Sequence, residues 1–186
     1  MKSVLISIQP KWCELIASGK KTVEVRKTKP MLETPFKCYI YCTNTKPYLV
    51  WGDVFRGNWE TEFTHLSGYN RKDAEKIWDV FNGKVIGEFV CDTFITDKTF
   101  GHDALIRAAA CMSDADAAAY CTKNIMYAWH ISDLVIYDEP KELGEFHSYN
   151  CGVKIENGYP MPTHEITRPP QSWCYVEEAE KDCGEG

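Results

Sequence analysis

Three charged residues that lie close together in the sequence have side chains suited to chemistry. Glu24 and Arg26 alternate with two valines, so a strand would turn both charged side chains to one face. Lys21 precedes them, shortly after Gly19. A carboxylate accepts hydrogen bonds from base amino groups, a guanidinium forks onto phosphate oxygens, and a desolvated lysine can act as a base. Residues 19–26 therefore predict a site for a nucleobase or an anion.

Each of these residues also has an interpretation without function. Glu24 and Arg26 could form an ion pair that only orders the strand, and such a pair contributes little if it is exposed. Lys21 could be a solvated lysine that interacts with the dipole at the end of a helix. The sequence leaves both interpretations open.

Further candidates lie outside this segment. Trp12, Trp129 and Trp173 could each offer a stacking surface to a base, although a tryptophan packs more often in a core. A Pro-Pro pair fixes the backbone near the end of the chain. The residues that flank it could present polar groups to a ligand, or they could only seal the fold. The candidate ligand contacts are Lys20, Lys21, Glu24, Arg26, Trp129, Arg168, Gln171 and Ser172.

Short strands and helices must position these side chains. Residues 3–8 are rich in β-branched types, which predicts a strand, and Pro10 then begins a short helix that ends at Gly19. The pattern predicts further strands at 22–26, 36–43, 84–97, 127–137 and 173–176, and helices at 70–83 and 114–121. We expect an α+β fold, a small closed or half-closed β-barrel flanked by short helices, with an irregular insertion at about 44–69.

Composition limits the class of protein. With 186 residues and 44% hydrophobic content, the chain predicts one domain at 1–176 and a charged, disordered tail at 177–186. The net charge of −6 argues against coating nucleic acid through bulk charge, while a local basic groove stays open. Apolar runs are too short for a membrane span and no signal peptide is evident, so we expect a cytoplasmic protein. Nine cysteines without a regular framework indicate reduced thiols, and no metal or cofactor is expected.

The spacing Gly19-x-Lys21-x-x-Glu24-x-Arg26, after a strand and a short helix, resembles the signature of the ASCH domain family. The fold of that family is similar to the PUA domain of RNA-modifying proteins. Residues 129–132 and 168–173 resemble a bacterial and phage-borne branch of the family. The resemblance implies a barrel with a cleft, lined by the motif, that binds RNA or a modified nucleotide.

The resemblance also implies that some relatives are enzymes. One group is similar to an amidohydrolase acting on N4-acetylcytidine, in which a lysine matching Lys21 and a threonine matching Glu24 serve the chemistry; other relatives are described as ribonucleases. This chain has glutamate in place of that threonine, so that activity does not transfer directly, and because no unmistakable nucleophile–base pair is visible we predict a binding module. The first alternative is a hydrolase of a nucleoside amide or of RNA, with Lys21 and Glu24 as catalytic residues. The second is a phage or prophage accessory protein that binds another protein through residues 44–69.

Overall fold

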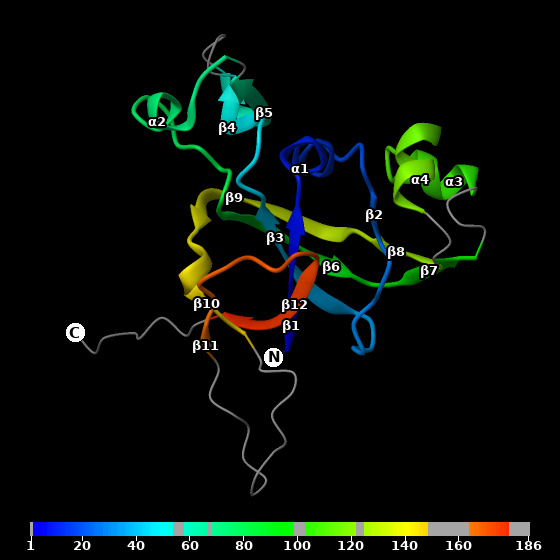
Figure 1. Ribbon diagram of the computed structural model, residues 1–186. Coiled ribbons are helices and arrows are strands. Elements are labelled where there is room, and N and C mark those ends of the chain that lie inside the picture. The colour runs from blue at the N-terminus through cyan, green and yellow to red at the C-terminus, as the bar shows by residue number, and fades with distance from the viewer. Residues whose placement is uncertain are drawn as a thin grey trace, which may run out of the picture.

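A seven-stranded sheet with the order β11-β10-β12-β1-β3-β6-β9 forms the body of the molecule (Figure 1). The computed structural model describes residues 2–53, 58–66, 68–98, 103–121, 125–148 and 164–178. The strands of this sheet are β1 (Ser3–Ile8), β3 (Phe36–Cys42), β6 (Val85–Cys91), β9 (Ser132–Lys141), β10 (Phe146–Ser148), β11 (His164–Glu165) and β12 (Trp173–Glu178). Central β1 is buried along its whole length, pairs parallel with β3 and antiparallel with β12, and confirms the predicted first strand.

A second sheet has the order β2-β8-β7, with antiparallel pairs throughout. Its strands are β2 (Val23–Arg26), β8 (Met126–His130) and β7 (Phe94–Asp97), and two helices beside it are α3 (Ala104–Ala109) and α4 (Asp114–Tyr120). Val23 and Val25 pack in one cluster with the residues of α3 and α4. Glu24 lies opposite Trp129 in the register, and Trp129 belongs to the core of the large sheet. The predicted alternation therefore turns the charged face of β2 towards β1.

Helix α1 (Pro10–Ala17) joins β1 to β2, as the sequence predicts. Proline occupies its first turn, where the missing N–H leaves no hydrogen bond unmade. Cys13 and Ile16 are buried beneath the helix. Gly19 has a φ of 70°, the left-handed conformation that glycine adopts at low cost, and this turn sends the chain into β2.

The prediction of irregular structure at 44–69 is wrong for the described part of this segment, which forms an antiparallel hairpin. Its strands are β4 (Tyr48–Asp53) and β5 (Asn58–Leu66). Leu49 packs in the main core while neighbouring Val50 packs with Leu66 in a separate cluster. Because both faces of β4 are covered, its sequence lacks the alternation of apolar and polar residues that marks a half-exposed strand.

The predicted helix at 70–83 is much shorter. Asn70 caps α2 (Arg71–Ala74) by accepting from the Asp73 N–H, as its type and position predict. The chain then leaves the helix, and Phe81 donates its backbone N–H to Leu49 O of the hairpin. Tertiary contacts thus override the helical spacing of the apolar residues.

Two predicted long strands are each broken and shared between the sheets. The run at 84–97 divides into β6 of the large sheet and β7 of the small one, and the run at 127–137 divides into β8 and β9. Gly87 coincides with a register shift between β6 and β9. The mixture of sheets and short helices confirms the α+β class. The predicted barrel is not found, because no pairing among the described strands closes either sheet.

The remaining elements complete the described chain. A 3-10 helix, η1 (Leu143–Glu145), leads into β10. β12 extends through Glu178, and the rest of the predicted tail, 179–186, lies outside the described residues. No helix in the described ranges is long and apolar enough to span a membrane.

Candidate functional site

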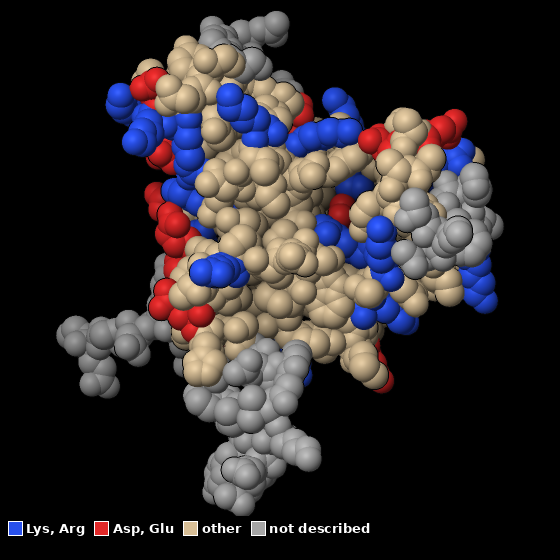
Figure 2. Space-filling view, in the orientation of Figure 1, with Lys and Arg blue, Asp and Glu red and all other residues tan. Residues whose placement is uncertain are grey.

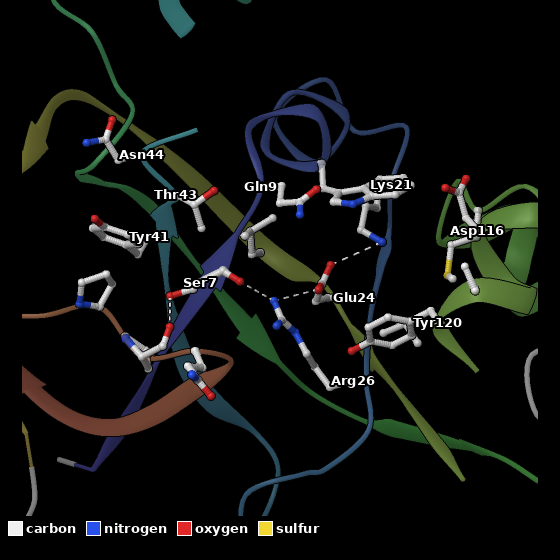
Figure 3. Close-up of a pocket in the computed structure, with 18 residues that line it drawn as sticks. Ser7, Gln9, Lys21, Glu24, Arg26, Tyr41, Thr43, Asn44, Asp116 and Tyr120 are labelled. Atoms are coloured by element: carbon white, nitrogen blue, oxygen red, sulfur yellow. Dashed lines mark hydrogen bonds and ion pairs between the residues drawn. The ribbon is translucent and has the colours of Figure 1, made fainter. Parts of the chain in front are cut away.

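A cavity of about 680 Å³ lies where the end of β1, α1, β2 and α4 meet (Figure 3). Figure 2 shows a hollow in which acidic and basic side chains meet, between α1 and the α3–α4 pair. The lining residues come from segments distant in sequence: Ser7, Ile8, Gln9, Trp12, Lys21, Glu24, Val25, Arg26, Tyr41, Thr43, Asn44, Met112, Asp116, Ala119, Tyr120, Pro169, Pro170 and Gln171.

Lys21, Glu24 and Arg26 form a connected charged trio on the wall of this cavity. Glu24 Oε2 lies 3.3 Å from Lys21 Nζ, and Glu24 Oε1 lies 3.0 Å from Arg26 Nη2. The three residues are only 3%, 6% and 8% exposed, in sequence order. The ion pair is therefore buried and not exposed, and the loss of any partner would be costly.

Backbone carbonyl groups hold the two cations in place. Lys21 Nζ donates to Ala110 O at 2.9 Å, and the backbone N–H of Lys21 donates to Leu15 O at 2.8 Å. Arg26 Nη2 donates to Ser7 O at 2.7 Å, at the end of β1. The interpretation of Lys21 as a solvated lysine is therefore wrong: the trio ties β1, β2 and the end of α3 together.

The trio retains hydrogen-bonding capacity that its neighbours do not use. Arg26 Nε is buried and has no hydrogen-bond partner among the described residues. Arg26 Nη1 makes only a long contact of 3.4 Å with Ser172 Oγ. With two cations around one carboxylate, the trio carries a net positive charge. An unmet buried donor is costly, so Arg26 is held beside the cavity with donor capacity that the described residues leave unused.

Two aromatic rings flank the charged trio. The Lys21 ammonium lies 5.1 Å from the centre of the Trp12 ring, and the Lys11 ammonium lies 4.1 Å from it. Tyr120 of α4 lies on the other side, beside Arg26 (Figure 3). Burial raises the pKa of the Tyr120 hydroxyl, so it is neutral near pH 7. The rings offer apolar surfaces on either side of a polar wall.

The structure brings some of the predicted ligand contacts together. Lys21, Glu24, Arg26 and Gln171 line the cavity. Ser172 lies behind the wall and contacts Arg26 through its hydroxyl. These residues converge although about 145 positions separate the two segments, because Ser7 donates its N–H to Ser172 O at 2.9 Å.

Other predicted contacts lie elsewhere. Lys20 is exposed and does not line the cavity. Arg168 is exposed and borders a separate depression of about 300 Å³. Trp129 is fully buried, with its ring centre 5.6 Å from that of Phe94 and 6.0 Å from that of Phe36. Trp129 is therefore a core residue, and its interpretation as a stacking surface is wrong.

Asp116, Tyr120 and Ser7 are cavity residues that the sequence interpretation missed. Asp116 caps the start of α4: the Ser113 backbone N–H and hydroxyl donate to its carboxylate. These hydrogen bonds lower the pKa of Asp116. Ser7 is a hydroxyl residue within an apolar strand, which was the one available signal. Nothing local in the sequence places Tyr120 near β2.

His130 forms a polar contact outside the cavity. Its Nδ1 lies 2.7 Å from Asp92 Oδ1.

The cysteines are free thiols in the described ranges. Burial raises the pKa of Cys13 and Cys38, and it raises the pKa of Cys91 to about 12. No group of acidic, histidine and cysteine side chains in the described part of the chain is arranged to hold a metal.

Solved structures share this arrangement of elements. The crystal structure of ASCH from Zymomonas mobilis aligns with a TM-score of 0.56 at 18% identity, covering 94% of this chain and 87% of that chain. The chain has the ASCH-domain fold. Two mutant structures of ASCH from the same organism align with TM-scores of 0.56 and 0.54 at 17% identity, over 94% and 95% of this chain and 88% and 91% of theirs. No protein-family model and no curated protein matches the sequence.

The ASCH fold agrees with the resemblance drawn from residues 19–26. Within this ASCH fold the residues of the motif are not scattered: three of them form the buried trio on the cavity wall. The spacing of the motif thus corresponds here to one physical unit, with Gly19 providing the turn between α1 and β2.

Proposed function

We propose that the cavity binds RNA or a nucleotide by taking a nucleobase between Trp12 and Tyr120. The observation that carries the proposal is the buried trio of Lys21, Glu24 and Arg26 on the wall of a cavity of about 680 Å³. Small-molecule sites are typically about 300–1,000 Å³ in volume and combine apolar walls with a few fixed polar groups. This cavity has both properties.

Each member of the trio has a role in the proposed site. Glu24 accepts from an exocyclic amino group or ring N–H of the base, while Lys21 and Arg26 donate to base carbonyl or ribose oxygens. Trp12 offers a ring for stacking, which is a common mode of binding to single-stranded RNA. The likeness to ASCH structures, and the similarity of that family to the PUA domain of RNA-modifying proteins, supports RNA binding in general.

Replacing Trp12 by alanine is expected to weaken nucleotide binding by about 5- to 150-fold, because base–aromatic stacking contributes about 1–3 kcal/mol. Calorimetric titration of the four ribonucleosides and their monophosphates measures the affinity. Trp78→Ala is the matched control, since Trp78 packs against Tyr69 in a different cluster. Equal affinity of wild type and Trp12→Ala would contradict stacking on Trp12.

A hydrolase is the second candidate, and the 3.3 Å contact of Lys21 with Glu24 favours it. Lys21 would accept a proton from the attacking water, and Glu24 would carry a proton to the amine or alcohol that leaves as the amide or phosphodiester bond breaks. The Ser7 hydroxyl donates to Pro170 O at 2.6 Å, so it is not positioned as a free nucleophile. Incubation with N4-acetylcytidine and with labelled RNA tests this candidate: product formation that is lost in Lys21→Ala supports it, and no turnover by wild type removes it for these substrates.

The alternative of a phage or prophage module that binds a protein through residues 44–69 stays a prediction. The hairpin β4–β5 packs on α1 and the core through Leu49 and Phe63. These contacts give the hairpin a structural role, which makes the cavity the better candidate.

A further inference from the structure

We infer that the cavity is the first subsite of a longer site for single-stranded RNA, in which the base enters the cavity and the adjoining phosphates and the next base lie outside. This inference rests on the proposed function. The outer subsite consists of Lys27, Lys29, Tyr127 and Phe94. Three observations support the inference. They are the charges that line the cavity, the lack of a carboxylate partner for Lys27 and Lys29 among the described residues, and the register of β2 with β8.

The charged side chains that line the cavity favour a neutral part of the ligand in it. Its lining includes two carboxylates, of Glu24 and Asp116, which balance the formal charges of Lys21 and Arg26. Glu24 already lies within 3.3 Å of both cations. A phosphate in the cavity would approach these carboxylates, whereas a nucleobase can donate to them. The phosphates of a bound strand are therefore expected outside.

Two lysines stand where such phosphates would lie. Lys27 follows Arg26 directly, and its ammonium lies 4.8 Å from the centre of the Tyr120 ring, which lines the cavity. Lys29 has its ammonium 5.3 Å from the Phe94 ring centre and 5.8 Å from that of Tyr127. Figure 2 shows basic side chains gathered beside the hollow, along the side where β2 runs.

Neither lysine is neutralised by a carboxylate of the described residues. Elsewhere Lys37 pairs with Glu88 at 2.6 Å and Lys84 with Glu142 at 3.3 Å. Lys27 and Lys29 instead rest on aromatic rings, and both are exposed. A flexible lysine can leave the ring for a phosphate oxygen, and this uncovers the ring for a base. Basic side chains interleaved with aromatic rings are the usual means of binding a single strand.

The register of β2 with β8 makes the two subsites continuous. Arg26 lies directly opposite Tyr127 in the antiparallel pair, so the two side chains share one face of the small sheet. Phe94 belongs to β7, which pairs with β8 on its other side. A strand whose base reaches Arg26 in the cavity can thus continue past Lys27 to the rings beside Lys29.

The test compares a ribonucleoside with a tetraribonucleotide by calorimetry, using homo-oligomers of each base. Wild type is expected to bind the tetranucleotide at least about tenfold more tightly than the nucleoside. The double variant Lys27→Gln/Lys29→Gln is expected to lose most of this gain, measured as the ratio of its own affinities for tetranucleotide and nucleoside. Removal of two phosphate contacts should also reduce the slope of log affinity against log salt by about 1.4.

Lys72→Gln/Lys76→Gln is the control with the same change in charge. Both lysines belong to the α2 region, which lies away from β2 across the molecule (Figure 1). If wild type binds nucleoside and tetranucleotide equally, or if both double variants lose the same affinity, the outer subsite is overturned while the proposed function stands. If wild type binds neither ligand, both are overturned.

Discussion

Replacing Glu24 by alanine is expected to lower the free energy of unfolding by about 3–5 kcal/mol, because it leaves two buried cations without their shared carboxylate. Lys21 and Arg26 are each less than one-tenth exposed, and Glu24 contacts both. Backbone carbonyl groups would still accept from each cation, but they carry no compensating charge.

Urea denaturation followed by circular dichroism measures this effect. Glu24→Gln retains the shape and one acceptor, so its loss should be smaller. Glu75→Ala removes the partner of Arg71 from an exposed pair on a helix, where about 0.5 kcal/mol is expected. A loss for Glu24→Ala as small as that for Glu75→Ala would contradict the buried, coupled trio.

Replacing Trp129 by alanine is also expected to lower the free energy of unfolding by about 3–5 kcal/mol, through the cavity that the ring would leave. Trp129 is fully buried, and its ring contacts those of Phe36, Phe94 and Trp173. Trp129 belongs to β8 of the small sheet and packs in the core of the large sheet, so its loss would leave a space between the two sheets.

The same variant separates a core role from a ligand-binding role. Its melting temperature should fall sharply, while the fraction that stays folded in the cold should bind nucleotides with the affinity of wild type. Trp129→Phe, which fills part of the space, should recover part of the stability. Wild-type stability with lost binding would restore Trp129 as a stacking surface.

Local patterns of the sequence predicted the elements that depend on neighbouring residues. Strand 3–8, the helix from Pro10 and the left-handed turn at Gly19 follow from residue types within a few positions. So does the capping box of α4, in which Ser113 and Asp116 satisfy each other. In each case the free energy that selects the structure comes from contacts within the segment.

Features that depend on distant contacts were not predictable in the same way. The helix at 70–83 gives way because Phe81 bonds to the hairpin, and β4 hides its strand pattern because both its faces are covered. The same limit applies to the site. The spacing of Lys21, Glu24 and Arg26 indicated one face of a strand, but only the packing of β1 and α3 shows that this face is buried.

The most direct test of the proposed site is the indole N–H signal of Trp12 in a two-dimensional ¹H–¹⁵N NMR titration with nucleosides and nucleotides, assigned from the spectrum of Trp12→Phe. The proposal predicts that this signal shifts and saturates with at least one ligand, while the indole signal of Trp78 stays in place. Absence of a saturable shift at Trp12 with every ligand, or an equal shift at Trp78, would contradict the cavity as a nucleobase site.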